Sequence, residues 1–358
     1  MTVLIAGGGL AGAAAACLLG PRATLIERES AAHDKICGEF LSWETQEALH
    51  LLGIDPVALG AAPIDAVRLV HGDRVARAVL PGRGLGLSRR VLDEAVLARA
   101  EARGAMVHRG RAVKRLVPHG LEVEGMGRLE ADRVLLATGK HDLRGARREA
   151  SPESLVGLKM FYRLAPEQAE AVSGHVEVVL FPGGYAGLQP VEDGRANLCL
   201  LIRREAFERA GGTWTGVFSY LVRTSPHLAA RLRDAVQQLA RPEAIFRVPY
   251  GFVHAAAPAE MPGVFRLGDQ MGVIPSFSGD GMAIALHTAF AAAGESDAGA
   301  YHRRMRRDLS AQIGRAMTLH RLGQSQPRLV AAAARVWPGA LGWIARHTRV
   351  PAGRLAWR

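Results

Sequence analysis

The chain has 358 residues, of which 49% are hydrophobic and 22% charged, and this composition excludes a disordered or low-complexity protein. Its net charge of +11 lies neither on a recognised nucleic-acid-binding module nor among interleaved aromatic residues, so we expect no nucleic-acid partner. No run reaches the roughly 18 uninterrupted apolar residues of a transmembrane segment, and no basic leader precedes the first apolar run. Three scattered cysteines offer neither a disulfide framework nor metal-ligand spacing, so we expect a cytoplasmic protein without a metal site.

A nucleotide-binding turn opens the chain. The apolar run Val3–Ala6 leads directly into G-x-G-x-x-G at Gly7, Gly9 and Gly12. The first glycine permits the tight turn, the second lets the backbone approach a pyrophosphate, and the third lets the next helix pack close to the sheet. The N-terminus of that helix offers unpaired N–H groups to phosphates.

A second strand-like run supports this interpretation. It spans Ala23–Ile26 and ends on Glu27, where a motif of this kind has an acid that accepts hydrogen bonds from ribose hydroxyls. Between the two runs lies an alanine-rich helix that stops at Gly20-Pro21. Strand, glycine turn, helix, strand and acid therefore follow one another in the order of a dinucleotide-binding unit.

Helices and short strands alternate over the next hundred residues. Helices are predicted over 43–52 and 88–102, and strands over 66–70, 75–80, 106–108, 112–116, 121–124 and 133–139. The two runs that flank Gly72-Asp73 are expected to form a hairpin, and Ser88 is a candidate N-cap. The last run is mainly apolar and ends on Gly139, so it is expected to be a buried strand.

The middle of the chain has a different pattern. Strand-like runs at 176–181 and 196–202 flank Gly183-Gly184-Tyr185, and helices are predicted near 214–222 and 228–239. We interpret this part as an inserted, sheet-rich α+β domain. The strand-like run Val264–Asp269 and a helix from Gly281 to Ala293 then return to the nucleotide-binding fold.

The positive charge is concentrated in residues 301–358, which contain twelve arginines, no lysine and one acid. Arginines recur there among apolar residues, which predicts short basic amphipathic helices broken at Pro327 and at Pro338-Gly339. Two interpretations are open. Either these helices cover the nucleotide-binding domain with their arginines in water, or they attract an acidic carrier protein or an anionic membrane surface that holds the substrate.

Several motifs together resemble the flavoprotein superfamily of para-hydroxybenzoate hydroxylase, flavin-dependent halogenases and geranylgeranyl reductases. They are the glycine turn with Glu27, Arg89-x-x-Leu92-Asp93, Ala137-Thr138-Gly139, Gly268-Asp269 with Pro275, and Ser278-Gly279-Asp280-Gly281-Met282. The segments Lys35-x-Cys37-Gly38-Glu39 and Gly184–Pro190 are most similar to the geranylgeranyl reductase branch, although Gly187 stands where that branch has an aromatic residue. The halogenase signature Trp-x-Trp-x-Ile-Pro is absent, so halogenation is not expected.

The resemblance implies an α/β fold with a discontinuous Rossmann-like FAD-binding domain (1–62, 85–150 and 263–300), a substrate domain (63–84 and 151–262) and a basic helical segment (301–358). It implies that Asp269 binds the ribityl hydroxyls, that Pro275 lies beside the isoalloxazine, and that the helix beginning at Gly281 faces the pyrimidine edge. The FAD-binding residues expected in this way are Gly7, Gly9, Leu10, Ala11, Gly12, Glu27, Arg28, Cys37, Gly38, Arg89, Ala137, Gly139, Gly268, Asp269, Pro275, Gly279, Gly281 and Met282. Catalytic residues stay unassigned, with Cys37, Glu39, Tyr185 and Gln189 as pocket candidates.

The implied activity is that of an FAD-dependent oxidoreductase. NADPH or NADH, as a transient electron donor, would reduce FAD, which would then reduce a C=C bond of a hydrophobic small molecule or hydroxylate it. A monooxygenase of secondary metabolism is the alternative enzyme, and a flavin-binding scaffold that docks an acidic partner is the non-enzyme alternative. The substrate is either free, bound to a carrier protein or associated with a membrane, so a peripheral membrane location stays open beside the cytoplasm.

Overall fold

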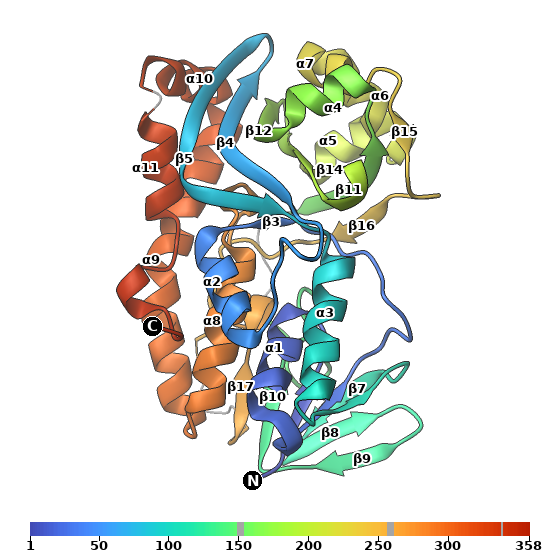
Figure 1. The fold of residues 1–358 in the computed structure, drawn as a ribbon, viewed down its shortest axis with the longest axis vertical. Helices are drawn as coiled ribbons and strands as arrows, with labels where there is room; N and C mark the ends of the chain where they lie inside the picture. The colour runs from blue at the N-terminus through green and yellow to red at the C-terminus, as the bar shows by residue number, and fades with distance from the viewer. Residues whose placement is uncertain (149–153, 256–260, 338) are drawn as a thin grey trace.

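The computed structural model describes residues 1–148, 154–255, 261–337 and 339–358, and it contains two large sheets joined by a column of C-terminal helices (Figure 1). The first sheet is parallel. Its strands lie in the order β17 (Val264–Arg266), β10 (Arg133–Leu136), β1 (Val3–Ala6), β2 (Ala23–Ile26) and β6 (Met106–His108). The predicted nucleotide-binding unit therefore forms the centre of this sheet.

The alternating side chains of β1 divide between two layers. Val3 and Ile5 belong to the core formed with helices α1 (Leu10–Leu19), α3 (Arg89–Ala102) and α8 (Gly281–Gly294). Leu4 and Ala6 belong to a second core, formed with the small antiparallel sheet of β7 (Val113–Val117), β8 (Gly120–Val123) and β9 (Gly127–Glu130). Helix α1 is rich in alanine and buried along nearly its whole length, because small side chains let it pack between α3 and α8.

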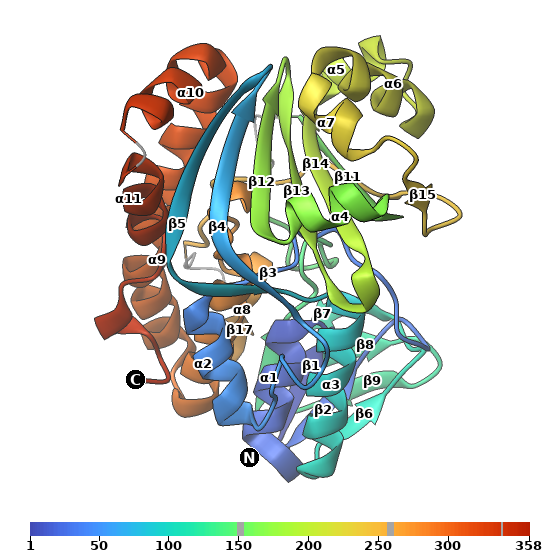
Figure 2. The same ribbon diagram turned by 45° about the horizontal axis from the view of Figure 1, so that its top comes forward.

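The second sheet is mixed and strongly curved (Figure 2). Its strands lie in the order β15 (Val236–Gln237), β11 (Leu155–Arg163), β14 (Ala196–Arg203), β13 (Gly184–Pro190), β12 (Gly174–Phe181), β4 (Ala62–His71), β5 (Arg74–Gly86) and β3 (Phe40–Leu41), and β16 (Glu243–Phe246) also pairs with β11. The expected hairpin is β4–β5, and β4 joins the rest of the sheet through a parallel pairing with β12. Residues from two separate stretches of chain thus build one sheet.

Helices cover both faces of the second sheet. Helices α4 (Pro166–Val172), α5 (Arg204–Arg209), α6 (Trp214–Thr224) and α7 (Pro226–Arg231) lie on the side of one core cluster. The side chains of the opposite face, Leu69 and Leu180 among them, belong to the core that contains α1, α3 and α8. Helices α9 (Ala298–Ser325), α10 (Pro327–Val336) and α11 (Gly339–His347) run along this side, and α10 and α11 contact β5. Helix α2 (Trp43–Leu52) has the predicted bounds and packs on α8.

Three details of the sequence-based prediction are wrong. The helix predicted over 228–239 ends at Arg231, because Asp234 has a left-handed backbone (φ 57°) and the chain then pairs with β11 as β15. Strands β3, β9, β11, β13 and β16 and helices α4 and α5 were not predicted. The first C-terminal helix is one helix of 28 residues, since apolar residues at helical spacing, such as Tyr301, Met305 and Leu309, give it a continuous buried side.

Two predicted local features are confirmed. The Ser88 hydroxyl caps α3 by accepting from the Val91 N–H at 3.3 Å, and the helix break before Pro327 is present. Pro338, at the second predicted break, and the predicted domain boundary at 150/151 lie outside the described residues.

Candidate functional site

A cavity of about 780 Å³ lies between the two sheets, at the carboxyl ends of the parallel strands. Gly7, Glu27, Ala137 and Leu267, which directly follow β1, β2, β10 and β17, all line it. This crevice is where open α/β sheets bind their ligands. The predicted residues that line it are Gly7, Gly9, Leu10, Ala11, Glu27, Arg28, Cys37, Gly38, Glu39, Arg89, Ala137, Gly139, Gly268, Asp269, Gly279, Gly281 and Met282.

Four predicted residues do not line this first cavity. Gly12 lies beneath the glycine turn, where an added Cβ would come within 1.9 Å of the Gly7 carbonyl oxygen. Pro275 is not among the lining residues, although its neighbours Ile274 and Ser276 are. Tyr185 and Gln189 line an adjoining second cavity instead.

The two later glycines of the turn have different surroundings. An added Cβ at Gly12 would meet backbone, whereas one at Gly9 would meet only the side chains of Arg89 (3.6 Å), Lys35 (3.7 Å) and Asp93 (3.9 Å). Gly9 has an ordinary extended backbone (φ −71°, ψ 178°), so its conformation does not require glycine. The space at Gly9 is therefore a cradle open to the cavity, while the absence of a side chain at Gly12 serves helix packing.

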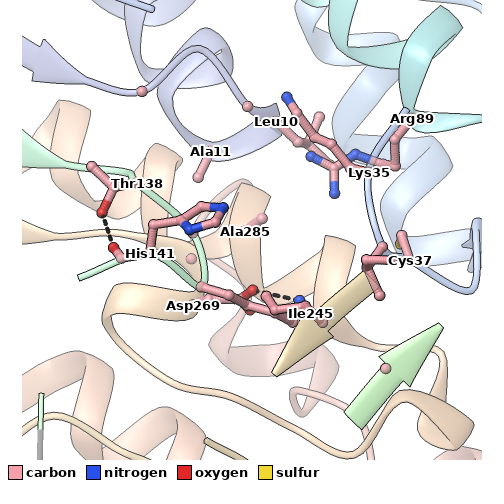
Figure 3. Close-up of a pocket in the computed structure, with 18 of the residues that line it drawn as sticks. Leu10, Ala11, Lys35, Cys37, Arg89, Thr138, His141, Ile245, Asp269 and Ala285 are labelled. Carbon is pink, nitrogen blue, oxygen red and sulfur yellow. Dashed lines mark hydrogen bonds and ion pairs between the residues drawn. The ribbon is translucent and has the colours of Figure 1, made fainter. Parts of the chain in front are cut away.

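Two cations lie beside this cradle. Figure 3 shows the side chains of Lys35 and Arg89 together near Leu10, at the start of α1. Asp93 fixes both of them, because its carboxylate accepts from Lys35 Nζ at 2.7 Å and from Arg89 Nε and Nη2 at 2.7 and 2.9 Å. Burial opposes ionisation of Asp93, but the two cations hold its pKa below the usual value. Positive charge next to a helix N-terminus suits a diphosphate.

Glu27 closes the other side of the turn. Its Oε2 accepts from the Gly8 N–H at 2.6 Å and its Oε1 accepts from the Glu29 N–H at 2.9 Å. The carboxylate thus fixes the backbone after β1 and after β2. Each oxygen retains acceptor capacity on the cavity side, which suits ribose hydroxyls.

Asp269 lies across the cavity from Lys35 and Arg89 (Figure 3). Its Oδ2 pairs with Lys140 Nζ at 2.8 Å, and its carbonyl oxygen accepts from Arg148 Nη1 at 2.9 Å. Burial favours the neutral acid, but Lys140 and Arg148 hold the pKa of Asp269 below its usual value, so it is an anionic acceptor at neutral pH. Sequence reasoning missed Lys140, although its position directly after Ala137-Thr138-Gly139 at a strand end was a usable signal.

The segment Cys37-Gly38-Glu39 is held between the first cavity and the second sheet. Glu39 is fully buried with a positive φ of 62°, and its Oε1 accepts from Lys159 Nζ at 2.5 Å and from the Arg89 N–H at 3.0 Å. Burial raises the pKa of Glu39 to about 7, despite the lowering effect of Lys159. Asn197 Nδ2 donates to the carbonyl oxygens of Cys37 and Gly38 at 3.1 and 3.0 Å.

These contacts fix a turn that borders the first cavity and, through Gly38, the second. Sequence reasoning missed Lys159 and Asn197, each a polar residue in an apolar strand, because their partner segment lies more than 100 residues away. An isolated lysine in Leu155–Arg163 was the available signal for a buried ion pair.

A second cavity of about 290 Å³ adjoins the first, and both are lined by Gly38, Phe40, Cys199, Ser276 and Gly279. Its walls are mainly apolar. One wall comes from the second sheet, with Val67, Leu69, Leu80, Val176, Val178 and Leu180. The other comes from α9, α10 and α11, with Leu319, Leu322, Val330, Ala333, Ala334, Leu341, Ile344 and Ala345.

A hydroxyl chain lies near the junction of the two cavities. The Tyr185 hydroxyl is 2.7 Å from Ser276 Oγ and 3.4 Å from the Tyr250 hydroxyl, and Tyr250 accepts from the Ser276 N–H at 3.0 Å. Burial raises the pKa of Tyr185 well above its usual value, so this phenol keeps its proton at neutral pH. Gln189 Nε2 is buried in the same cavity without a hydrogen-bond partner among the described residues.

No protein-family model matches the chain. A sequence relative is digeranylgeranylglycerophospholipid reductase 2 of Methanopyrus kandleri, 28% identical over 313 residues, which are 80% of this chain and 73% of the relative. Among solved structures, the flavin-dependent brominase Bmp2 has a TM-score of 0.80 at 16% identity, covering 97% of this chain and 92% of the brominase. A probable FAD-dependent monooxygenase, pqsL of Pseudomonas aeruginosa, has a TM-score of 0.67 at 19% identity, covering 93% and 96%.

The myxobacterial chondrochloren halogenase CndH also shares the fold, with a TM-score of 0.75 and 18% identity over 99% of this chain and 95% of the halogenase. Identities this low establish the shared fold, not a shared reaction. Within the described ranges, none of the helices has both the length and the apolar character needed to cross a membrane. The chain is thus similar in sequence to a reductase of a geranylgeranylated lipid, and it shares its fold with flavin-dependent halogenases and a probable FAD-dependent monooxygenase.

Proposed function

We propose that this protein is an FAD-dependent oxidoreductase that uses FAD in the first cavity to reduce a C=C bond of a hydrophobic small molecule held in the second. The observation that carries the proposal is the mainly apolar cavity that opens onto the predicted flavin site through five shared lining residues. Apolar walls favour a substrate with little polar surface. Reduction is chosen over hydroxylation because the sequence relative is named a reductase of a geranylgeranylated lipid.

The residues of the first cavity would hold FAD along its length. The Gly9 cradle, Lys35 and Arg89 would bind the diphosphate, and Glu27 would accept from the adenosine ribose. Asp269 would accept from the ribityl hydroxyls. The N-terminus of α8 at Gly281 would face the pyrimidine edge, where its N–H groups favour negative charge. When bound and reduced by NADPH or NADH, FAD supplies a hydride.

Saturating a C=C bond also consumes a proton. We assign this proton to Tyr185, because Tyr185 lines the second cavity and its hydroxyl lies 2.7 Å from Ser276 Oγ. Its hydroxyl contacts Ser276, which lines both cavities, so the proton leaves beside the junction where the flavin and the substrate meet. The cavity volume of about 290 Å³ is close to the lower limit of about 300 Å³ for ligand pockets. It suits a small molecule or one end of a longer chain.

The test is an anaerobic half-reaction with geranylgeraniol as an isoprenoid probe. We expect NADPH or NADH to bleach the flavin, and the probe to restore the flavin absorbance while gaining two hydrogen atoms by mass spectrometry. Flavin that neither nucleotide reduces would contradict the proposed donor. If the probe gains one oxygen atom in air and is unchanged without air, the reaction is hydroxylation and not reduction.

Gly187→Phe tests where the substrate binds. Gly187 lines the second cavity, and an added Cβ meets only the Cys199 carbonyl oxygen, at 3.7 Å, so the strand tolerates a side chain that fills the cavity. We expect bound FAD and nucleotide-dependent bleaching to persist, and probe-dependent reoxidation to be lost. Gly314→Phe, at an exposed position of α9 with nothing within 4 Å, is the matched control. If the probe fully reoxidises the flavin of the Gly187 variant, the substrate does not bind in the second cavity.

A further inference from the structure

The end of α9 and helices α10 and α11 expose large apolar side chains at one corner of the molecule. These side chains are Leu322 (45% exposed), Leu329 (64%), Val336 (87%), Trp337 (64%) and Trp343 (47%). We call them, with the arginines described next, the C-terminal corner; it lies at the upper left of Figure 1. Single exposed apolar residues are normal, but two tryptophans and three aliphatic residues on adjoining helices indicate a binding surface.

The corner is also positively charged. Arg321, Arg328, Arg335 and Arg346 are exposed on the same three helices. The last three form no ion pair with any residue in the described ranges, and residues 309–358 contain no aspartate or glutamate. Unpaired guanidinium groups around exposed tryptophans are the pattern of an interfacial anchor, in which indoles enter the headgroup region and arginines contact lipid phosphates.

The second cavity reaches the surface at this corner. Leu322 lines the cavity and is 45% exposed, and Ala333 of α10 also lines it and is exposed. Between them, Val330 is half-buried and lines the same cavity. Apolar side chains therefore extend from this surface into the cavity and offer a hydrophobic molecule an apolar path inward.

We propose that the C-terminal corner docks on an anionic lipid surface and that the hydrophobic substrate passes from the lipid into the second cavity. The role of the cavity rests on the proposed function, whereas the docking rests on the exposed side chains alone. An acidic carrier protein would pair with the arginines but leave Trp337 and Trp343 in water. Anionic lipid satisfies both the charge and the indoles, which favours a membrane as the partner.

The test measures binding of the FAD-loaded protein to sedimented vesicles of phosphatidylcholine, with and without phosphatidylglycerol. We expect binding to the anionic vesicles at low salt, with a blue shift of tryptophan fluorescence, and at least tenfold weaker binding to neutral vesicles. Changing Arg328, Arg335 and Arg346 to Gln should weaken anionic binding by about a hundredfold, since each basic residue near the surface contributes about a fivefold factor. Trp337→Ser with Trp343→Ser should abolish the fluorescence shift.

The control changes the same net charge elsewhere. Arg90 on α3 and Arg303 and Arg306 on the first turns of α9 are exposed, and Figure 1 shows the start of α9 at the far end of that helix from the corner. Their triple change to Gln should weaken vesicle binding much less than the corner triple. If the two triple variants lose vesicle binding equally, the binding depends only on net charge, and the C-terminal corner is not a docking site.

Other results also overturn the docking. They are a lack of wild-type binding to anionic vesicles at low salt, or tight binding of an acidic acyl carrier protein that the tryptophan changes leave intact. Bleaching of the flavin by NADPH, measured in the same samples, keeps failure of docking separate from failure of the proposed oxidoreductase activity. Retained flavin absorbance shows that each variant is folded.

Discussion

The contrast between Gly9 and Gly12 gives the sharpest test of the proposed cofactor site. A Gly9→Ala change adds a Cβ that meets nothing closer than 3.6 Å in the protein and needs no unusual backbone angle. The contacts of the new methyl group should therefore change the free energy of unfolding of the protein without FAD by less than about 0.5 kcal/mol. Alanine also restricts the unfolded chain, which should raise the free energy of unfolding by about 0.4–1 kcal/mol.

The same Cβ occupies the space between the turn and the cations Lys35 and Arg89. A phosphate oxygen that hydrogen-bonds to the turn must come within about 3 Å of a backbone nitrogen, and a methyl group there prevents that approach. Loss of one hydrogen bond to a charged group costs about 1.5–3 kcal/mol, so FAD should bind between about tenfold and a hundredfold more weakly.

Gly12→Ala should instead lower the stability of the protein even when no FAD is bound. Its Cβ would lie 1.9 Å from the Gly7 carbonyl oxygen and 3.1 Å from the carbonyl carbon, so the turn or α1 must shift. Such overpacking costs about 1–3 kcal/mol of unfolding free energy even without FAD. Urea unfolding of the two apoproteins and fluorescence titration with FAD separate the effects. Wild-type FAD affinity in Gly9→Ala, or wild-type stability in Gly12→Ala, would refute the assignment of the turn.

Three further predictions concern acidic side chains and their partners. Asp269→Ala should weaken FAD binding by about 1–3 kcal/mol, and unchanged flavin occupancy after gel filtration would remove Asp269 from the ribityl site. Arg349→Met should lower the free energy of unfolding in urea by about 3–5 kcal/mol, because Arg349 lies 3.4 and 3.5 Å from the buried carboxylates of Glu44 and Asp280; a loss below about 1 kcal/mol would contradict this. Burial raises the pKa of Glu39 from 4.5 to about 7, so the folded protein binds this proton more tightly than the unfolded chain. The contribution of Glu39 to stability should therefore fall as pH rises from about 4.5 to about 7, and Glu39→Gln should show a smaller fall than wild type in urea titrations across this range; parallel curves would refute it.

The sequence predicted the features that local patterns encode. The glycine turn, the acid after β2 and the bounds of α2 follow from spacing and capping over a few residues, and the first cavity contains most of the residues that the family resemblance implied. The end of α7 was missed because Asp234 adopts a left-handed backbone that pairing of β15 with β11 stabilises. Residues 228–239 carry no such signal by themselves.

Long-range contacts were also beyond the sequence. Lys159 is 120 residues from Glu39, so its burial against that carboxylate follows from the arrangement of β11 rather than from any spacing. The arginine-rich pattern at the C-terminus left a helical cover and a docking surface as alternatives. Among the described residues of these helices, only those of α9 pack on the nucleotide-binding fold, against β17 and α8, whereas α10 and α11 pack on β4 and β5 of the second sheet. The expected cover of the nucleotide-binding domain is therefore formed by α9 alone, and the exposed side of all three helices remains available for docking.

The parallel pairing of β4 with β12 also has a consequence for folding during synthesis. Leu69 pairs with Val178, more than 100 residues later in the chain, so the β4–β5 hairpin is made long before its partner strand. At about 5–20 residues per second, the edge of β4 would wait on the order of 5–20 s for β12. During that interval an unpaired strand with apolar side chains is open to chaperones or to another nascent chain. The step that closes the second sheet is therefore the step at which we expect misfolding to compete with folding.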